Sequence, residues 1–197
     1  MRNWILKKNW NYCLFFLALS TSLSSETLTA KASWNWSASP QASEWKEFQK
    51  LSYKSRSSLW KEINRSPLAF EKMAWEWRLA WVQTCGVSVE AWCSRLMQES
   101  LFDKALVVRA ETAVRLGERF AGTGHKTVLR ILSTAYAVQQ NSRSTKPLYV
   151  QYRILHAIKQ IGGPGGLALG ERLAANSPQT SRYWQLLSNQ SRSSQEF

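Results

Sequence analysis

The sequence has few of the residues that build metal centres and disulfide frameworks. Three cysteines among 197 residues are too few for a small protein held together by disulfides. The only two histidines, His125 and His156, stand far apart, with no carboxylate or cysteine at ligand spacing. No apolar run approaches the roughly 20 residues that cross a bilayer, which excludes a multi-pass membrane protein. We therefore expect neither a metal site nor a cofactor.

Acidic residues are also scarce. The chain has 13 Asp and Glu against 26 Lys and Arg, so its formal net charge is +13. Aromatic residues, in contrast, make up 12% of the chain and include 11 tryptophans. So many large apolar side chains exclude an intrinsically disordered protein. The length suits one domain, or at most two small ones.

Residues 1–32 have the three parts of a secretory signal peptide. Residues 1–8 are basic, residues 12–19 are continuously apolar, and residues 30–32 form an A-x-A pattern before Ser33. The apolar stretch is short for a membrane span, so a retained anchor is the weaker interpretation. We expect an exported protein, periplasmic or secreted, whose mature chain begins at Ser33 and carries a net charge of +10.

Export changes the interpretation of the cysteines. Only Cys85 and Cys93 remain in the mature chain, in an oxidising compartment. Between them, Gly86 is expected to end one helix and Ser88 to cap the next, so the two cysteines flank a helix–helix turn. The alternatives are a disulfide and two buried thiols that pack as small apolar side chains. A catalytic thiol has less support, because neither histidine is placed beside a cysteine in the sequence.

Apolar residues recur at every third or fourth position, which predicts helices throughout. No run alternates as a strand would, and no Asn-Gly or Asp-Gly hairpin turn is present. Residues 33–57 are expected to form a mobile leader, up to Ser39, and an N-terminal helix. A helical domain follows over 58–188, and residues 189–197 are expected to be a disordered tail.

Serine–proline pairs mark two helix starts. Ser66-Pro67 and Ser177-Pro178 each combine a capping side chain with a proline at the first helical position. The glycine-rich segments 122–127 and 162–166 are expected to be turns. The first has a superficial likeness to a phosphate-binding loop, but His125 separates glycine from lysine and no strand precedes it.

Three segments of the helical domain align with one another. They read WRLAWVQTCG (77–86), VRAETAVRLG (108–117) and YRILHAIKQIG (152–162), and each places an arginine after its first residue. These arginines, Arg78, Arg109 and Arg153, are spaced by 31 and 44 residues. Periods of about 30 to 47 residues with two helices each are typical of α-solenoids.

The middle copy carries a family resemblance. Residues 103–120, DKALVVRAETAVRLGERF, resemble the second helix of a HEAT repeat, most of all the phycobilisome-lyase type. The resemblance implies an all-α fold, a short α-solenoid of antiparallel helix pairs over 58–86, 88–120, 125–162 and 164–188.

The match is clear only over 103–120. Lys72 and Pro147 stand where the other copies would need the equivalent of Asp103, so an Asp–Arg ladder between repeats is expected to be incomplete. The spacing of Asp103 and Arg109 favours an ion pair within the middle copy.

A stacked array of helix pairs offers a surface lined by second helices, where extended partners bind. Trp75 lies off the face shared by Trp77 and Trp81, which we assign to the core, so Trp75 is the better interface candidate. The basic C-terminal half would steer anionic partners. The candidate binding residues are Trp75, Arg115, Arg119, Lys126, Arg130, Arg153, Lys159 and Arg172.

We therefore expect an exported, non-catalytic scaffold that binds a protein of the cell envelope. An anionic polymer or a lipid surface is an alternative partner. Nucleic acid is not expected, because an exported protein does not meet it.

An enzymatic alternative rests on Glu99. The segment 98–105, QESLFDKA, resembles the Glu-Ser motif of lytic transglycosylases, in which a glutamate acts as general acid and base on peptidoglycan. That glutamate needs an apolar pocket that keeps it protonated. The proline usual before Lys-Ala and the Gly-Leu-Met-Gln-type segment expected about fifteen residues later are both missing. The competing interpretation is a solvated glutamate at a turn.

Overall fold

A computed structural model of the chain describes residues 34–65, 70–142 and 148–193. Met1–Asn35 and Trp36–Phe197 form two separate units, and every helix described below belongs to the second. No strand occurs in the described part of the chain. The prediction of an all-α protein is therefore confirmed. The expected signal peptide, residues 1–32, lies outside the described residues.

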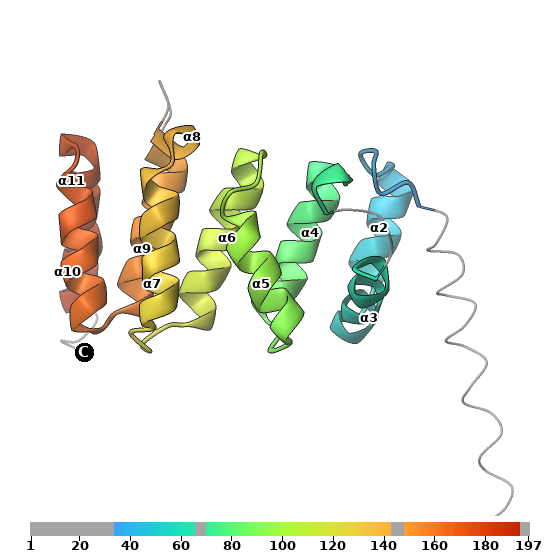
Figure 1. Cartoon of the computed structure of the whole chain (residues 1–197), viewed down its shortest axis with the longest axis horizontal. Coiled ribbons are helices and arrows are strands. Elements are labelled where there is room, and N and C mark those ends of the chain that lie inside the picture. The colour runs from blue at the N-terminus through green and yellow to red at the C-terminus, as the bar shows by residue number, and fades with distance from the viewer. Residues whose placement is uncertain (1–33, 66–69, 143–147, 194–197) are drawn as a thin grey trace, which may run out of the picture. The chain divides into compact units, whose positions relative to one another are not determined.

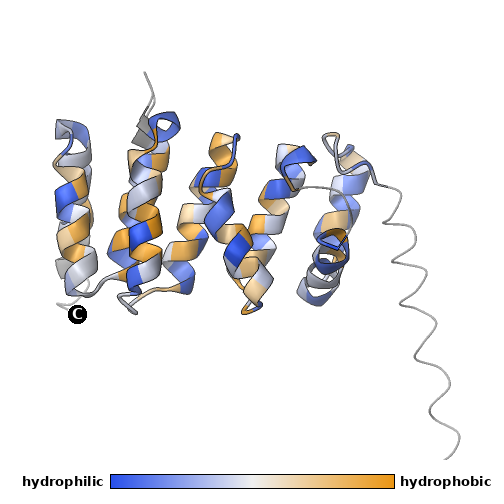
Figure 2. Cartoon of the chain, viewed as in Figure 1, coloured by the Kyte–Doolittle hydropathy of each residue, from blue (hydrophilic) through white to orange (hydrophobic). Residues whose placement is uncertain are grey.

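Figure 1 shows the helices of the second unit following one another in chain order. Figure 2 shows that each combines apolar and polar residues, as the 3.6-residue period of the sequence requires. The α-helices are α2 (Ala42–Lys50), α3 (Tyr53–Ile63), α4 (Trp75–Gly86), α5 (Ala91–Ser100), α6 (Leu106–Arg119), α7 (Lys126–Ala137), α8 (Gln139–Ser142), α9 (Leu148–Ile161), α10 (Gly163–Ala174) and α11 (Pro178–Ser193). One 3₁₀ turn, η1 (Phe70–Lys72), lies between α3 and α4.

The helices pack in two sets. Helix α6 contacts α4 on one side and α9 on the other, and α9 also contacts α11. The remaining long helices pack onto this first set: α3 on α4, α5 on α4 and α6, α7 on α9, and α10 on α9 and α11. Helices α4, α6, α9 and α11 thus form a continuous row of contacts.

The closest approach between α6 and α9 depends on a glycine. A Cβ atom on Gly117 would lie 2.7 Å from Cα of Ala157, which is nearer than two such atoms can come. Both residues belong to the aligned segments of the sequence. Their small size lets the two helix backbones pack directly on each other.

Tryptophans form the core at the α3–α4 end. Trp60 stacks on Trp81 with ring centroids 5.4 Å apart, and its indole Nε1 donates to Oγ1 of Thr84. Trp77 is fully buried and packs edge-on against Phe48. The assignment of Trp77 and Trp81 to the core is confirmed.

The segment before α2 is held against this core, in contrast to the mobile leader that its sequence suggests. The ring of Trp36 meets those of Trp60 and Trp77 edge-on. The carbonyl of Trp36 accepts from the N–H of Ala74, and the carbonyl of Ala38 accepts from Nε1 of Trp77. Aromatic burial and these hydrogen bonds fix a segment that has no helical period of its own.

The helix starts confirm one serine–proline cap and correct other expectations. Ser177 Oγ accepts from the N–H of Thr180, so it caps α11 as predicted. Ser66-Pro67 lies outside the described residues, and the helix expected from there begins later, at Trp75. Ser88 does not cap α5, which begins at Ala91; its hydroxyl accepts from Glu90 within the connecting turn.

The two ends of the helical domain also differ from expectation. The polar segment after Tyr136, expected as a loop, includes the short helix α8. At the C-terminal end, α11 continues to Ser193, beyond the start of the expected tail at 189. Residues 194–197 lie outside the described residues.

Candidate functional site

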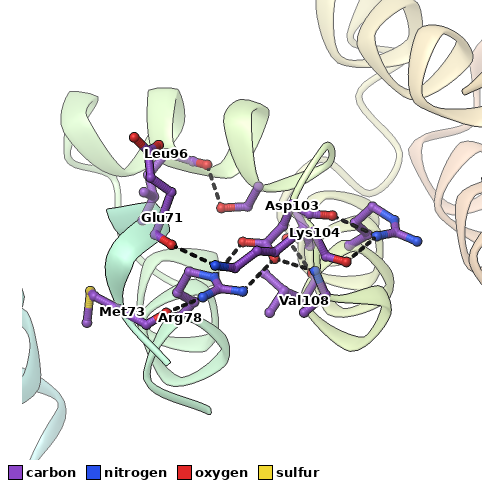
Figure 3. Close-up of polar contacts among 11 residues, drawn as sticks. Glu71, Met73, Arg78, Leu96, Asp103, Lys104 and Val108 are labelled. Carbon is purple, nitrogen blue, oxygen red and sulfur yellow. Dashed lines mark hydrogen bonds and ion pairs between the residues drawn. The ribbon is translucent and has the colours of Figure 1, made fainter. Parts of the chain in front are cut away.

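A buried ion pair lies at the junction of α4 and the segment that precedes α6. Arg78 Nε donates to Oδ2 of Asp103 at 2.7 Å, and Nη2 donates to Oδ1 at 2.9 Å. The side chains are 1% and 5% exposed. Asp103 Oδ1 also accepts from the N–H of Ala105, and Arg78 Nη1 donates to the carbonyl of Met73. This carboxylate is fully engaged in holding two helix starts together (Figure 3).

The prediction of an ion pair between Asp103 and Arg109 is wrong. Arg109 Nη1 donates to the backbone carbonyls of Asp103 and Lys104, and Nε donates to Oδ1 of Asn141 at 2.6 Å. The Asp103 carboxylate turns instead to Arg78, which reaches it from the preceding helix. Burial lowers the pKa of Arg109 from its ordinary value, and the charge of Asp103 opposes this shift.

Arg78 and Arg109, which align in the sequence, make equivalent bonds. Each donates from Nη1 to the carbonyl five residues before it and from Nε to a side-chain oxygen of a later segment, that of Asp103 or Asn141. Asn141 takes the place that Asp103 has one step earlier. Arg153, the third aligned arginine, is exposed and lies over the ring of Tyr149, at 5.3 Å from its centroid, so it does not continue the series.

A groove of about 500 Å³ opens beside Arg78. Its lining comes from the segment before α2, from η1 and the start of α4, and from the segment before α6. We call it the Lys72–Lys104 groove, after its two exposed lysines. The residues that line it are Ser37, Ser39, Lys72, Met73, Ala74, Trp75, Arg78, Lys104 and Ala105.

The groove is electrostatically positive. Lys72 and Lys104 give its lining two cationic side chains that have no acidic partner in the described residues, whereas Asp103 neutralises the third, Arg78. No acidic side chain is among its described lining residues. Ala74 and Ala105 are the N-caps of α4 and α6, and neither has a side chain that caps the helix. Two helix N-termini, each with partial positive charge, therefore meet at this groove. Lys104 Nζ donates to the carbonyl of Glu71, which holds η1 near α6 (Figure 3).

Of the predicted binding residues, only Trp75 lines the Lys72–Lys104 groove. It is 43% exposed, as expected for an interface residue. The sequence analysis did not identify Lys104 as a site residue, and it noted Lys72 only as a departure from the repeat pattern. The signal that was present is that each lysine lies within three residues of a helix start and of an aromatic residue, Trp75 for Lys72 and Phe102 for Lys104.

The predicted basic residues do not form one cluster. Arg115 pairs with Glu111 and Glu118 and lines a second cavity, of about 360 Å³, with Tyr53 and Arg56. Arg119 donates to Oγ of Ser94. Lys159 Nζ lies 5.7 Å from the ring centroid of Trp184. The remaining predicted residues are exposed, and they are Lys126, Arg130, Arg153 and Arg172.

Glu99 lies near the C-terminal end of α5 with an exposed side chain. Its backbone carbonyl accepts from the N–H of Phe102 at the following turn. The general acid of a glycosidase needs apolar surroundings, and an exposed carboxylate does not have them. The environment of Glu99 is that of a solvated turn residue.

Two of the cysteines form a disulfide. Cys85 on α4 and Cys93 on α5 have Sγ atoms 2.06 Å apart and Cα atoms 5.0 Å apart. Both residues are fully buried. Of the two alternatives, the structure has the disulfide, which joins the end of α4 to the first turn of α5.

Titratable side chains of α9 interact with side chains of α6 and of α11. His156 Nδ1 and Gln160 Oε1 are buried on α9 and have no hydrogen-bond partner. Burial lowers the pKa of His156, Arg153 lowers it further, and Glu118 raises it. Burial raises the pKa of Tyr183, whose ring stacks on Tyr152.

The glycine-rich segment after α6 is a turn. Gly122 and Gly124 have positive φ angles of 71° and 60°, and their N–H groups donate to the carbonyls of Gln160 and Ile161 on α9. These N–H groups point into the protein, whereas a phosphate-binding loop aims them at its ligand. Among the described residues there is no group of three or more His, Cys, Asp or Glu that could hold a metal ion. None of the described helices is long and apolar enough to cross a membrane.

Comparison of the chain with protein-family models, with curated proteins and with solved structures finds no match.

Proposed function

We propose that this chain is an exported, non-catalytic helical-repeat protein that binds an anionic partner in the cell envelope. The observation that carries this proposal is the Lys72–Lys104 groove, a concave surface with two exposed lysines, an exposed tryptophan and no acidic residue among its described lining residues. Such a surface is complementary to an anionic segment of another molecule. A protein partner of the envelope is the first expectation, and an anionic polymer or lipid surface is the alternative.

The repeat assignment is supported by the equivalent roles of Arg78 and Arg109. Both link one helix pair to the next through a side-chain oxygen, at Asp103 and Asn141. The packing of second helices on second helices, α4 on α6 and α6 on α9, agrees with a short HEAT-like α-solenoid.

Export is supported by the disulfide between Cys85 and Cys93, because disulfides persist in oxidising compartments. Its test is to express the full chain with its own residues 1–32 and to determine the cell fraction and the first residue of the product. We expect an envelope or secreted product that begins at Ser33. A cytoplasmic product that begins at Met1 would contradict export.

The binding proposal is tested by co-purification from an envelope extract with the tagged chain, at low and at high salt. We expect partners that are retained at low salt and released at high salt, because screening weakens exposed charge pairs. A variant in which Lys126, Arg130, Arg153 and Arg172 become glutamate measures how much these C-terminal charges contribute to partner binding. Retention that does not respond to salt would contradict recognition by charge.

The enzymatic alternative has its own measurement. Purified cell wall is incubated with the wild-type chain and with Glu99→Gln. We expect no soluble product from either. Turnover that Glu99→Gln abolishes would overturn the non-catalytic assignment.

A further inference from the structure

We propose that the Lys72–Lys104 groove binds an acidic peptide segment of a partner protein, with the lysines on a carboxylate and Trp75 on an adjacent apolar side chain. This inference rests on the proposed function and names the class of ligand and the place where it binds. It commits to a peptide in preference to a membrane, a polymer or a second copy of this chain.

The size and shape of the groove suit a short segment. Its volume is about 500 Å³, and it is open to solvent. Its lining comes from Ser37 and Ser39, from Lys72 to Arg78, and from Lys104 and Ala105, so an extended segment lying in it would contact three separate parts of the chain.

The charges in the groove are available to a ligand. Lys104 Nζ uses one of its three donors on the carbonyl of Glu71, which leaves two. Lys72 has no ion pair with a described acid, and its side chain is exposed. Arg78 is different, because Asp103 already neutralises it. The net positive charge of the groove therefore comes from the two lysines, and the N-termini of α4 and α6 add to it.

Apolar surface lies beside these charges. Trp75 is 43% exposed at the first position of α4. Phe102 and Leu106 lie near Lys104 in the sequence and are 41% and 43% exposed, but they are not among the described lining residues. An exposed aromatic side chain next to cations favours a ligand that carries both carboxylate and apolar groups. An acidic peptide with interspersed apolar residues has this composition.

A second copy of this chain fits the groove poorly. The formal net charge is +13 for the whole chain and +10 without residues 1–32, so two copies repel each other at low salt. The occupant expected from charge complementarity is acidic and comes from another protein.

The experiment uses the full chain and a fluorescein-labelled peptide of about eight residues in which Glu and Leu alternate. Binding is measured by fluorescence anisotropy for the wild type, for Lys72→Glu/Lys104→Glu, and for Lys126→Glu/Arg130→Glu. The last variant is a matched control, because it has the same change in net charge at exposed residues of α7, outside the groove. Circular dichroism and the melting temperature verify that each variant is folded.

We expect the groove variant to weaken binding on the order of tenfold or more and the control by only a few-fold, since contact pairs contribute more than remote charges. Trp75→Ala should weaken binding of the Glu–Leu peptide more than it weakens binding of a peptide in which Ser replaces Leu. Equal losses in the two charge-reversed variants would overturn the groove assignment. A preference for vesicles of phosphatidylserine that depends on Lys72 and Lys104, without peptide binding, would overturn the peptide as ligand.

The two levels of the proposal fail separately. If the groove variant still retains its envelope partners in a salt-sensitive way, the groove assignment is wrong and the proposed function stands. If wild-type chain retains no partner at low salt but binds the peptide through the lysines, the groove assignment stands and the envelope function is wrong.

Discussion

Arg78 and Asp103 form a bidentate ion pair that is almost completely buried between α4 and the start of α6. A buried charge that loses its partner is left without compensation, which costs about 3–5 kcal/mol. We expect Asp103→Leu to lower the free energy of unfolding by about this amount, as measured by urea denaturation.

The control for this pair is Arg115→Ala, which removes partly exposed pairs with Glu111 and Glu118 and should cost only about 1 kcal/mol or less. The double variant Arg78→Met/Asp103→Leu removes both buried charges and should be more stable than Asp103→Leu alone. If Asp103→Leu is at least as stable as Arg78→Met/Asp103→Leu, then the unpaired charge of Arg78 does not destabilise the folded state, and the prediction is wrong.

Gly117 supports the second prediction. Because a Cβ atom there would meet the backbone of Ala157 at 2.7 Å, Gly117→Ala must push α6 and α9 apart. We expect a loss of about 1–3 kcal/mol in the free energy of unfolding, the cost of overpacking a close contact.

Gly165→Ala is the matched control for Gly117. Gly165 lies in α10 with nothing within 4 Å of the added carbon, so alanine should leave stability unchanged or raise it by up to about 1 kcal/mol. Equal effects of the two substitutions would contradict direct packing of α6 on α9.

The sequence predicts the fold class because its evidence is local. A 3.6-residue period is visible within a single helix, and Ser177-Pro178 lies next to the helix that it starts. The burial of Trp77 and Trp81 follows from the same period. The attachment of Trp36 is not visible in this way, because its partners, Trp60 and Trp77, lie on later helices.

The partners of the arginines show the same limit. Asp103 and Arg109 are six residues apart, which favours a local pair, but Arg78 reaches the carboxylate from 25 residues away. The Lys72–Lys104 groove joins three segments that the sequence separates. Only the packing of α4 on α6 brings Lys72 and Lys104 to one hollow.

The disulfide gives the third prediction. Cys85 and Cys93 close a short loop, with a sequence separation of 8 residues. Cross-linking a loop of this length restricts the unfolded chain and stabilises the folded state by about 2–3 kcal/mol in the loop-entropy model. Cys85→Ala/Cys93→Ala should lower the melting temperature accordingly, with helix content retained in circular dichroism. Intact mass of the unreduced protein should rise by two hydrogens on reduction, and a mass that does not change would contradict the disulfide.

His156 determines the last prediction, a dependence of stability on pH. Burial lowers its pKa below the ordinary value of about 6.5, and Arg153 acts in the same direction, whereas Glu118 opposes them. Below about pH 6.5 the unfolded chain therefore binds a proton that the folded chain does not, so the folded state loses stability as pH falls. His156→Gln removes this contribution, and its melting temperature should fall less between pH 7 and 5.5 than that of the wild type. Glu118→Gln removes the charge that raises the pKa of His156, so its melting temperature should fall more. Identical pH profiles for His156→Gln and the wild type would show that His156 does not titrate differently in the folded and unfolded states.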